Sequence, residues 1–437
     1  MIINLARRAH NHNFELDPII RSLLDTDFYK LLMLQLIWKE FANTHVTFSL
    51  VHRAGDTPMA GVVDPDELCA QLDHVRKLRF SKSELIWLAG NTFYGKRGIF
   101  EPDFLDWMEH GFELSDYDIV AHGEQFSLHF HGPWPQTTLW EIYALAIVSE
   151  LRTRASLKYL TEFELDILYA RAKAKLWGKV ERLRAEPDLR ISDFGTRRRH
   201  SFLWQEYVVN AMNATLGPSF TGTSNSYLAY KLGLEAIGTN AHELPMGLAA
   251  LARNDEELRT AQYRILEMWQ NTYQGALHIL LPDTFGTTQF LHNAPEWVAD
   301  WTGQRADSKD PFIAGDEYIT WLEARGRDPR QKLFIASDSL DDDLILRLHQ
   351  HFAGRIRFSA GWGTLLTNDF RGCNPQTGPT RANFTPPRTV CKLTEVEGRP
   401  AVKLSDNYLK ALGPAAEVER YRRIFGSAGM ANTPIRT

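Results

Sequence analysis

The sequence is poor in cysteine and has no excess of positive charge. Its 437 residues include three cysteines, Cys69, Cys373 and Cys391, which are too few for a disulfide framework and too widely spaced for a zinc motif. Lys and Arg total 49 against 54 Asp and Glu, so the clustered positive charge that binds nucleic acid or an anionic membrane is not indicated. We therefore expect a cytoplasmic protein that binds neither nucleic acid nor membrane.

Long apolar runs are also absent. The longest, Leu139–Val148, contains Glu141 and falls far short of the roughly 20 residues that cross a bilayer. It predicts a buried helix, whose start is marked by Thr138 and Glu141 at capping-box spacing. Residues 1–16 lack the apolar segment of a secretion signal, so none is expected. The length and average composition predict two or three globular domains.

After Pro187, short apolar segments ending in polar or small residues alternate with amphipathic stretches such as 201–216 and 340–352. This alternation is typical of parallel βαβ units. A closed barrel and an open doubly wound sheet both fit, and both place active sites at the carboxyl ends of the strands. The seven predicted strands end near Asp193, Thr223, Thr239, Asp283, Asp307, Asp338 and Gly361.

Two further elements lie outside this repeat. Residues 162–186 have a helical pattern that stops at Pro187. Residues 389–396 and 399–405 predict two short strands joined by a Glu-Gly turn. The chain therefore ends in a hairpin region that follows a Pro- and Gly-rich stretch.

The segment DFGTRRRH, residues 193–200, is the densest positive cluster and precedes a predicted helix. Guanidinium groups and the N–H groups of a helix start can together bind an anion. A solvated, charged helix start is the alternative. The glycines of AGWGTLLT, residues 360–367, follow the last strand, where barrels often bind phosphate.

Three carboxylates, Asp283, Asp307 and Asp338, each end a predicted strand. If they converge, their repulsion predicts a cation or substrate hydroxyls between them, as in a magnesium-bound polyol phosphate. Alternatively, each caps the helix that follows. His242 also follows a strand end and is either a pocket residue or a core histidine. No spacing indicates a metal site built from protein ligands alone.

In their order and spacing, nine motifs closely resemble the nicotinate phosphoribosyltransferase family, over residues 20–410. They are DTDFYK (25–30), GPWPQTTLWE, DFGTRRR, GTSN, GTNAHE, RADSKDP (305–311), ASDSLD, GWGT and CKLTEVEGRPAVKLSD. The resemblance implies an irregular seven-stranded TIM-like α/β barrel (156–370), an N-terminal α/β domain (1–155) and a C-terminal segment (371–437) that completes that domain.

The resemblance also implies a reaction. Nicotinate and 5-phosphoribosyl diphosphate would give nicotinate mononucleotide and diphosphate in NAD salvage, with Mg²⁺ accompanying the diphosphate. ATP hydrolysis would be coupled through a phosphohistidine at His242. The partners would then be these small molecules and a second subunit, in a homodimer with a shared active site.

Residue roles follow by the same resemblance. Phe194 and Tyr29, the latter from the partner subunit, would enclose the pyridine ring, and Arg197 and Arg305 would bind its carboxylate or the phosphates. The other matched positions are Thr239 at the substrate, Asp283 and Asp307 near ribose and magnesium diphosphate, and Gly361, Gly363 and Thr364 at the 5′-phosphate.

The motif Gly222-Thr223-Ser224 predicts the acid as substrate, because relatives that use nicotinamide carry Asp in place of Ser224. Lys309 stands where the family has Gly, so the loop and the role of Asp310 are expected to differ. Nicotinamide phosphoribosyltransferase, quinolinate phosphoribosyltransferase and a non-catalytic nucleotide-binding barrel are the alternatives. The phosphohistidine motif argues against the quinolinate enzyme.

Overall fold

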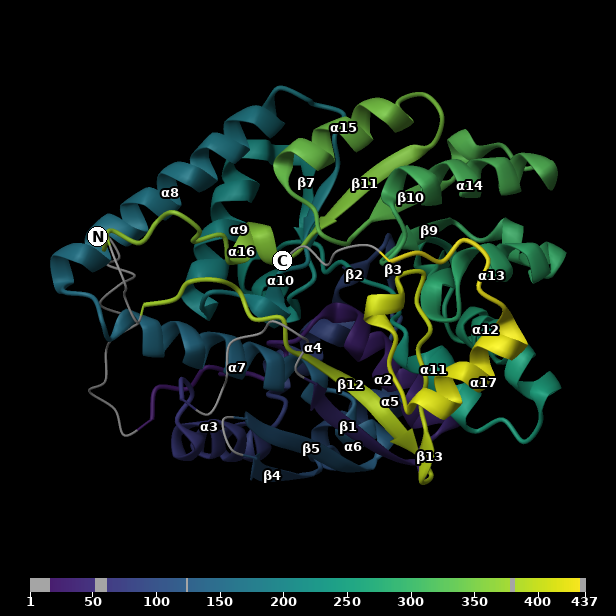
Figure 1. Ribbon diagram of the computed structural model, residues 1–437, viewed down its shortest axis with the longest axis horizontal. Coiled ribbons are helices and arrows are strands. Elements are labelled where there is room, and N and C mark those ends of the chain that lie inside the picture. Colours follow the sequence, from purple (N-terminus) through teal and green to yellow (C-terminus); the bar gives the residue numbers. More distant parts are fainter. Residues whose placement is uncertain (1–15, 52–60, 123–124, 378–381, 433–437) are drawn as a thin grey trace.

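The computed structural model describes residues 16–51, 61–122, 125–377 and 382–432 (Figure 1). The expectation of no secretion signal concerns residues that, except for Leu16, lie outside this part of the chain. Within it, no helix combines the length and apolar character needed to cross a membrane.

One sheet is antiparallel and joins the two ends of the chain. Its strand order is β13-β12-β1-β5-β4, with β1 His45–Val51, β4 Asp116–His122, β5 Gln125–Pro133, β12 Val390–Val396 and β13 Arg399–Pro400. Strand β12 pairs with β1, with Val396 opposite Val46. The predicted hairpin is confirmed, because Glu397 and Gly398 both have positive φ, as a type I′ turn requires. Its second strand is shorter than predicted.

A small antiparallel sheet pairs β2 Thr92–Phe93 with β3 Lys96–Arg97. The third sheet is parallel and forms the barrel. Its order is β7-β6-β11-β10-β9-β8, with β6 Ile191–Asp193, β7 Phe220–Thr223, β8 Ile279–Leu280, β9 Gly303–Ala306, β10 Leu333–Ala336 and β11 Arg357–Trp362. Ala236 forms an isolated parallel bridge with Thr223 of β7, and the segment around Ala236 takes the place of a seventh barrel strand. Beside it, the Asn240 side chain donates to the carbonyl of Ile279 on β8 at 2.9 Å. This confirms the irregular α/β barrel, which the strand pattern alone left undecided.

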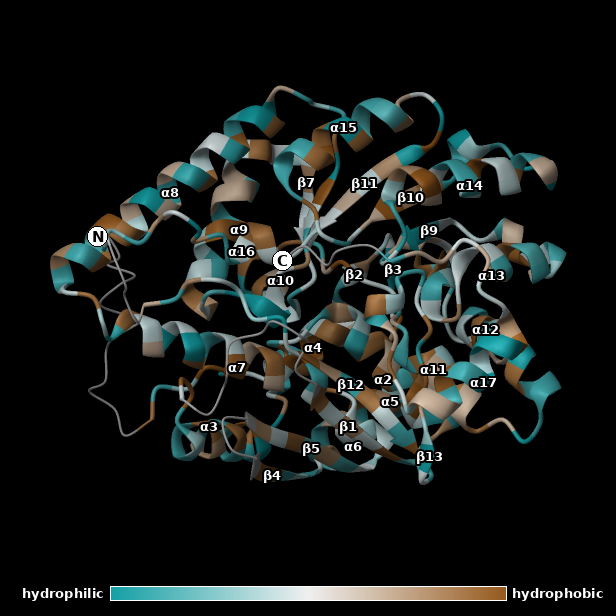
Figure 2. Cartoon of the chain, viewed as in Figure 1, coloured by the Kyte–Doolittle hydropathy of each residue, from teal (hydrophilic) through white to brown (hydrophobic). Residues whose placement is uncertain are grey.

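The predicted helices of the barrel are present as α8 Glu162–Arg184, α9 Phe202–Leu216 and α15 Asp342–Phe352. Hydrophilic residues recur along α8, at the edge of the molecule (Figure 2). The remaining α-helices of the described part are α2 Phe28–Glu40, α3 Pro65–Lys77, α4 Lys82–Gly90, α5 Pro102–His110, α6 Trp134–Thr137, α7 Trp140–Leu157, α10 Ser226–Leu232, α11 Glu243–Ala250, α12 Asp255–Thr272, α13 Thr287–Asn293, α14 Pro311–Ala324, α16 Thr364–Thr367 and α17 Ala415–Phe425.

Helix α7 is buried along almost its whole length, as predicted, but its start was predicted wrongly. It begins at Trp140 without a side-chain cap, so Thr138 and Glu141 form no capping box. Thr138 instead accepts from the buried Lys30 ammonium at 3.3 Å, and Glu141 pairs with Lys30 at 2.7 Å. A buried cation competes for these oxygens, and local spacing could not reveal it.

Candidate active site

A cavity of about 150 Å³ opens at the carboxyl ends of the barrel strands, between the barrel and β12. Its wall carries six cationic side chains and two carboxylates, although the whole chain has a net charge of −5. Positive charge concentrated in a concave site attracts anionic ligands. The cations are Arg197, Arg198, Arg305, Lys392, Lys403 and Lys410, and the carboxylates are Asp307 and Asp338.

Two aromatic side chains, Tyr29 and Phe194, also line the cavity. Tyr29 comes from the start of α2, and Phe194 follows β6. Gly361 does not line the cavity; a Cβ there would lie 2.3 Å from the Phe194 ring, so this glycine leaves room for the aromatic side chain. This chain's own Tyr29 lies in its own cavity, so one chain can supply this aromatic side chain, and a Tyr29 supplied by a partner subunit stays a prediction. A homodimer stays a prediction.

The three arginines of DFGTRRRH have different surroundings. Arg199 is fully buried and pairs with both carboxylate oxygens of Asp25, at 2.6 and 2.7 Å, so it ties the loop to the N-terminal segment. Arg197 and Arg198 line the cavity. The anion-site interpretation of this segment therefore fits two arginines, and the third is structural.

A buried carboxylate, Glu141, lies behind this wall. It contacts Lys392 at 2.5 Å and Arg197 at 3.7 Å. Burial alone would raise the pKa of Glu141, but the nearby Lys30, Lys392 and Arg197 cations hold it well below its usual range. Glu141 is thus an anion that stabilises two cations of the cavity.

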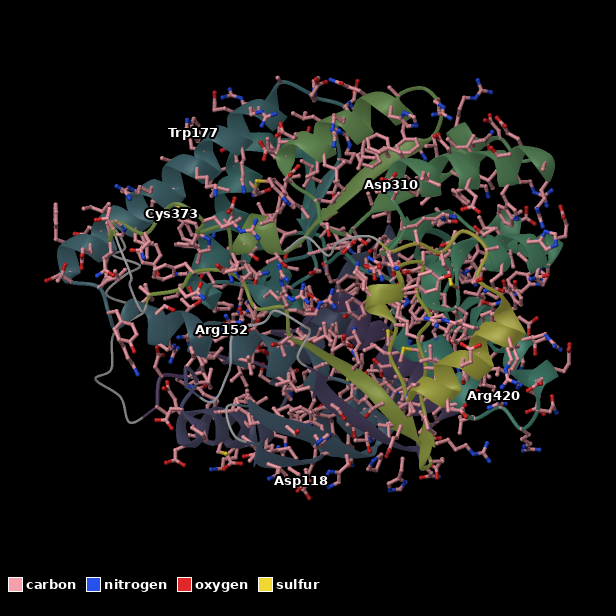
Figure 3. All side chains as sticks on the ribbon, viewed as in Figure 1. Asp118, Arg152, Trp177, Asp310, Cys373 and Arg420 are labelled. Atoms are coloured by element: carbon pink, nitrogen blue, oxygen red, sulfur yellow. The ribbon has the colours of Figure 1, made fainter. Side chains whose placement is uncertain are left out.

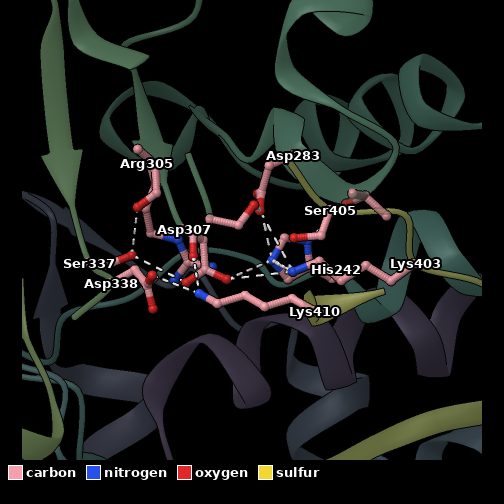
Figure 4. A network of polar contacts seen from close by, with 12 residues as sticks. His242, Asp283, Arg305, Asp307, Ser337, Asp338, Lys403, Ser405 and Lys410 are labelled. Carbon is pink, nitrogen blue, oxygen red and sulfur yellow. Dashed lines mark hydrogen bonds and ion pairs between the residues drawn. The ribbon is translucent and has the colours of Figure 1, made fainter. Parts of the chain in front are cut away.

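His242 lies at the centre of a polar network (Figure 4). Its Nδ1 is 2.9 Å from the Thr284 hydroxyl, and its Nε2 is 3.0 Å from both Asp307 Oδ2 and the Lys403 ammonium. With the ring proton on Nδ1, Nε2 accepts from Lys403 and Nδ1 donates to Thr284; with the proton on Nε2, that nitrogen donates to Asp307 instead. Figure 4 shows the Lys403 and Lys410 side chains reaching the cluster from the C-terminal segment.

The ionisation of this cluster follows from its surroundings. Burial, reinforced by the Lys403 ammonium, lowers the pKa of His242, so the imidazole is neutral at pH 7. Burial would raise the pKa of Asp307, but the His242 hydrogen bond and the Lys403 and Arg305 cations hold it well below its usual range. The site therefore pairs a neutral imidazole with an ionised carboxylate.

The three strand-end carboxylates do not cap helices. Asp310 caps α14 and Asp341 caps α15. Asp283 lies 3.6 Å from His242 and Asp338 lies 2.6 Å from Lys410, so both converge on the His242 region with Asp307. The prediction that the three carboxylates converge is therefore correct. Much of the positive charge that balances them comes from Lys403 and Lys410, which the strand pattern did not reveal.

His242, Asp283 and Asp307 could each offer a ligand atom to a metal ion, and these atoms lie within 4.8 Å of one another. Lys403, however, lies 3.0 to 3.7 Å from atoms of all three. An ammonium in this position already balances their charge. Asp307 and Asp338 are the carboxylates of the cavity wall, and carboxylate oxygens suit Mg²⁺, although each of the two also has a lysine within 3.7 Å.

Some predicted residues lie beside the cavity and not on its wall. The Ser224 hydroxyl donates to Asp27 at 2.7 Å, and Asp27 in turn lies 3.7 Å from Arg197. Ser224 and Thr239 are buried and are not among the lining residues, whereas Gly363 and Thr364 are. Ser224 is therefore linked to the cavity wall through Asp27 and Arg197, and its effect on the substrate stays a prediction.

Lys309 does not adopt a left-handed backbone conformation. Its φ is not positive, and its ammonium contacts Glu317 and donates to Thr288 at 2.9 Å. Asp310 accepts from the N–H groups of Phe312 and Ile313, at 3.0 and 3.2 Å. Asp310 is therefore the N-cap of α14, and a loop that differs from that of relatives stays a prediction.

Sequence reasoning missed Glu141, Lys392, Lys403 and Lys410 as parts of the site. Two of these lysines lie within the motif CKLTEVEGRPAVKLSD, which was interpreted from the sequence as a hairpin and as one of the nine family motifs, without a role for its lysines. Their role depends on β12 pairing with β1, a contact between residues more than 300 positions apart. The motif was the available signal, because its lysines alternate with apolar residues.

The fold and cavity define an α/β-barrel enzyme that acts on an anionic small molecule. A family model described as the nicotinate phosphoribosyltransferase (NAPRTase) family matches residues 189–428, and the model of that family's N-terminal domain matches residues 24–149. The chain belongs to the nicotinate phosphoribosyltransferase family.

Solved structures agree. The chain is similar to the crystal structure of nicotinate phosphoribosyltransferase from Vibrio cholerae, with 31% identity, a TM-score of 0.82 and coverage of 93% of this chain and 94% of that one. It is also similar to nicotinate phosphoribosyltransferase from Porphyromonas gingivalis, with 28% identity, a TM-score of 0.79 and coverage of 93% and 100%.

Proposed function

We propose that this chain transfers the phosphoribosyl group of 5-phosphoribosyl diphosphate to nicotinate, forming nicotinate mononucleotide and diphosphate in the cytoplasm. The observation that carries the proposal is the cavity in which six cations surround a pair of aromatic side chains. A flat, anionic pyridine carboxylate and a triply phosphorylated sugar together match that wall. Family membership supports the same reaction.

Each part of the wall has a role in this reaction. Tyr29 and Phe194 hold the pyridine ring, and Arg197 binds its carboxylate. The cations on the opposite side, Lys403 and Lys410 with Arg305, neutralise the departing diphosphate. The C1–O bond to diphosphate breaks as the pyridine nitrogen donates its electron pair to C1. No general base is needed, because that nitrogen carries no proton.

Mg²⁺ fits this proposal as a companion of the diphosphate, with Asp307 and Asp338 as the residues that would hold it. When bound, it would neutralise charge on the diphosphate oxygens. Asp307 also stabilises the positive charge that develops on the ribose ring as diphosphate leaves.

We further propose that His242 couples ATP to the transfer. The neutral Nε2 would attack the γ-phosphorus of ATP, forming an N–P bond as the bond to ADP breaks. Lys403 would stabilise the added phosphoryl charge, and Thr284 would retain the Nδ1 proton. Water would later cleave the N–P bond and release phosphate. A phosphate on His242 alters the charge beside the diphosphate site, which can change substrate affinity.

An acceptor assay tests the proposal. Purified protein with 5-phosphoribosyl diphosphate, Mg²⁺ and ATP is given nicotinate, nicotinamide or quinolinate, and the nucleotides are quantified by chromatography. We expect nicotinate to be used best, because nicotinamide offers no anion to Arg197. Preference for another acceptor would reject the nicotinate assignment, and absence of nucleotide with every acceptor would favour a non-catalytic barrel.

A variant of Ser224 tests the basis of this preference. In Ser224→Asp, a second carboxylate would lie beside Asp27 and compete for Arg197, so nicotinate turnover should fall much more than any turnover of nicotinamide. Ser224→Ala, which removes the hydroxyl without adding charge, is the matched control. An unchanged preference in Ser224→Asp would place discrimination elsewhere.

A further inference from the structure

The carboxylate of Glu141 connects two cations that reach the cavity from different parts of the chain. Arg197 comes from the loop after β6, and Lys392 comes from β12. Glu141 Oε1 contacts both, at 3.7 Å and 2.5 Å. Its Oε2 lies 2.7 Å from Lys30, which is completely buried. Glu141 itself does not line the cavity.

Both cations are long and flexible, and they extend toward the same space. Two like charges in a partly buried wall repel each other, and each loses side-chain entropy on being held there. A shared counter-ion offsets the repulsion and the lost entropy, and it fixes the guanidinium and the ammonium groups relative to each other. Arg197 has a second counter-ion in Asp27 at 3.7 Å, whereas Glu141 is the one carboxylate that contacts Lys392 among the described residues.

We propose that Glu141 is a positioning residue that holds Arg197 and Lys392 as one binding unit for the carboxylate and phosphate groups of the substrates. This inference rests on the proposed function. It replaces the capping role that the sequence indicated for Glu141. The first turn of α7 thereby sets the affinity of the site for anions without touching them.

Glu243 provides a matched control. It is equally buried and also pairs with Lys30, but its second partner is the Trp134 indole N–H, at 2.6 Å. It contacts neither Arg197 nor Lys392 in the structure. Glu141→Gln and Glu243→Gln each remove one buried negative charge beside Lys30, so both should lower thermal stability. A specific effect on substrate binding should appear only in Glu141→Gln.

Steady-state kinetics provide the first readout. In Glu141→Gln we expect the KM for nicotinate to rise about tenfold or more, with a smaller change in kcat, because the lost interaction acts on ground state and transition state alike. In Glu243→Gln the KM should stay within about twofold of wild type. A folded Glu141→Gln with a wild-type KM would overturn the proposal, as would equal KM changes in the two variants.

The pH dependence of kcat/KM distinguishes positioning by Glu141 from a purely structural role, because a purely structural role would not shift it. The groups facing Lys392 are Glu141, Arg197 and Lys403. Burial and the two cations lower the pKa of Lys392, and Glu141 opposes them. Without the Glu141 charge, Lys392 should lose its proton at lower pH, so the alkaline limb of kcat/KM should move to lower pH in Glu141→Gln. Glu141→Asp, which keeps the charge, should leave that limb near its wild-type position.

Calorimetric titration with inorganic diphosphate separates this proposal from the proposed function. If the wild type forms no nucleotide, the proposed function is wrong, but the titration still measures how tightly the cationic cavity wall binds diphosphate. Weaker diphosphate binding in Glu141→Gln than in Glu243→Gln supports positioning by Glu141, and equal binding overturns it. If Glu141→Gln does not fold, the comparison is made with Glu141→Asp, whose shorter side chain keeps the charge but cannot reach both cations. Its pH limb should then stay near that of wild type while its diphosphate affinity falls, and wild-type affinity would overturn the proposal.

Discussion

At the scale of single residues, His242 is the most constrained group of the site. Both ring nitrogens are engaged, and the side chain is buried. We expect His242→Asn to abolish ATP hydrolysis and phosphate labelling while slow, ATP-independent formation of nucleotide persists. The measurement uses γ-labelled ATP and counts acid-labile phosphate on the protein. Undiminished labelling of the variant would place the phosphate on another residue.

The charge state of His242 leads to a second residue-scale prediction. Its lowered pKa means that more of the ring stays neutral as the pH falls than in an ordinary histidine, so the rate of phosphate labelling should fall less between pH 8 and pH 6 than that of an ordinary histidine. An ordinary histidine of pKa 6.5 would lose about three-quarters of its neutral form at pH 6 and slow about fourfold. Lys403→Met removes the ammonium that lowers this pKa, so labelling by that variant should weaken as the pH falls. A wild-type rate that falls fourfold by pH 6 would contradict the ionisation state described above.

At the scale of elements, the packing of α11 fixes the position of His242, which directly precedes this helix. A Cβ at Gly247 would lie 2.1 Å from the Trp134 ring. Gly247→Ala should therefore displace α11 and destabilise the protein by about 1–3 kcal/mol, with loss of activity. Denaturant unfolding measures the stability change.

Gly178→Ala in α8 is the control for this substitution. No atom outside the helix lies within 4 Å of its added Cβ, so alanine should stabilise the protein by about 0.5–1 kcal/mol through its helix propensity. If Gly247→Ala were as stable as the control, the contact between α11 and Trp134 would not position His242.

The elements also show what local sequence can predict. The helix over residues 162–186 was predicted within two residues, because its helical pattern and Pro187 are local signals, and the structure adds a capping box of Thr161 and Glu164 at its start. The same spacing failed at Thr138 and Glu141, because Lys30 and Lys392, distant in the sequence, bind these side chains. Local rules fail at this site because buried charges from other elements compete for the capping groups.

At the scale of the whole molecule, charge is segregated. The chain carries a net charge of −5, whereas the cavity wall has six cations and two carboxylates. The outer surface is varied in charge, with residues such as Asp118 on β4 and Arg420 on α17 (Figure 3). Anionic substrates are thus attracted chiefly by the cavity itself.

This segregation predicts a salt dependence. Raising NaCl from about 0.05 to 0.5 M should increase the KM for 5-phosphoribosyl diphosphate about threefold to tenfold, because added ions screen the cavity charge. The kcat should change less, since the bound substrate is shielded from solvent ions. A KM that does not respond to salt would mean that recognition does not depend on the charge of the wall.

The sequence predicted the site residues that come from the barrel better than those that come from the C-terminal segment. Asp283, Asp307 and His242 follow barrel strands, and the strand pattern indicated where those ends would meet. Lys392 and Lys403 enter the site because β12 joins the N-terminal sheet, a pairing that no local pattern encodes. Tyr29 was assigned to a partner by resemblance, and only the fold showed that one chain can place it beside Phe194.

The central claim is that this cavity binds nicotinate between two aromatic residues with its carboxylate on Arg197. A crystal structure with nicotinate and a non-reactive analogue of 5-phosphoribosyl diphosphate tests it most directly. The account predicts the pyridine ring between Tyr29 and Phe194, with its carboxylate within hydrogen-bonding distance of the Arg197 guanidinium. Nicotinate bound elsewhere, or with its carboxylate directed away from Arg197, would contradict the account.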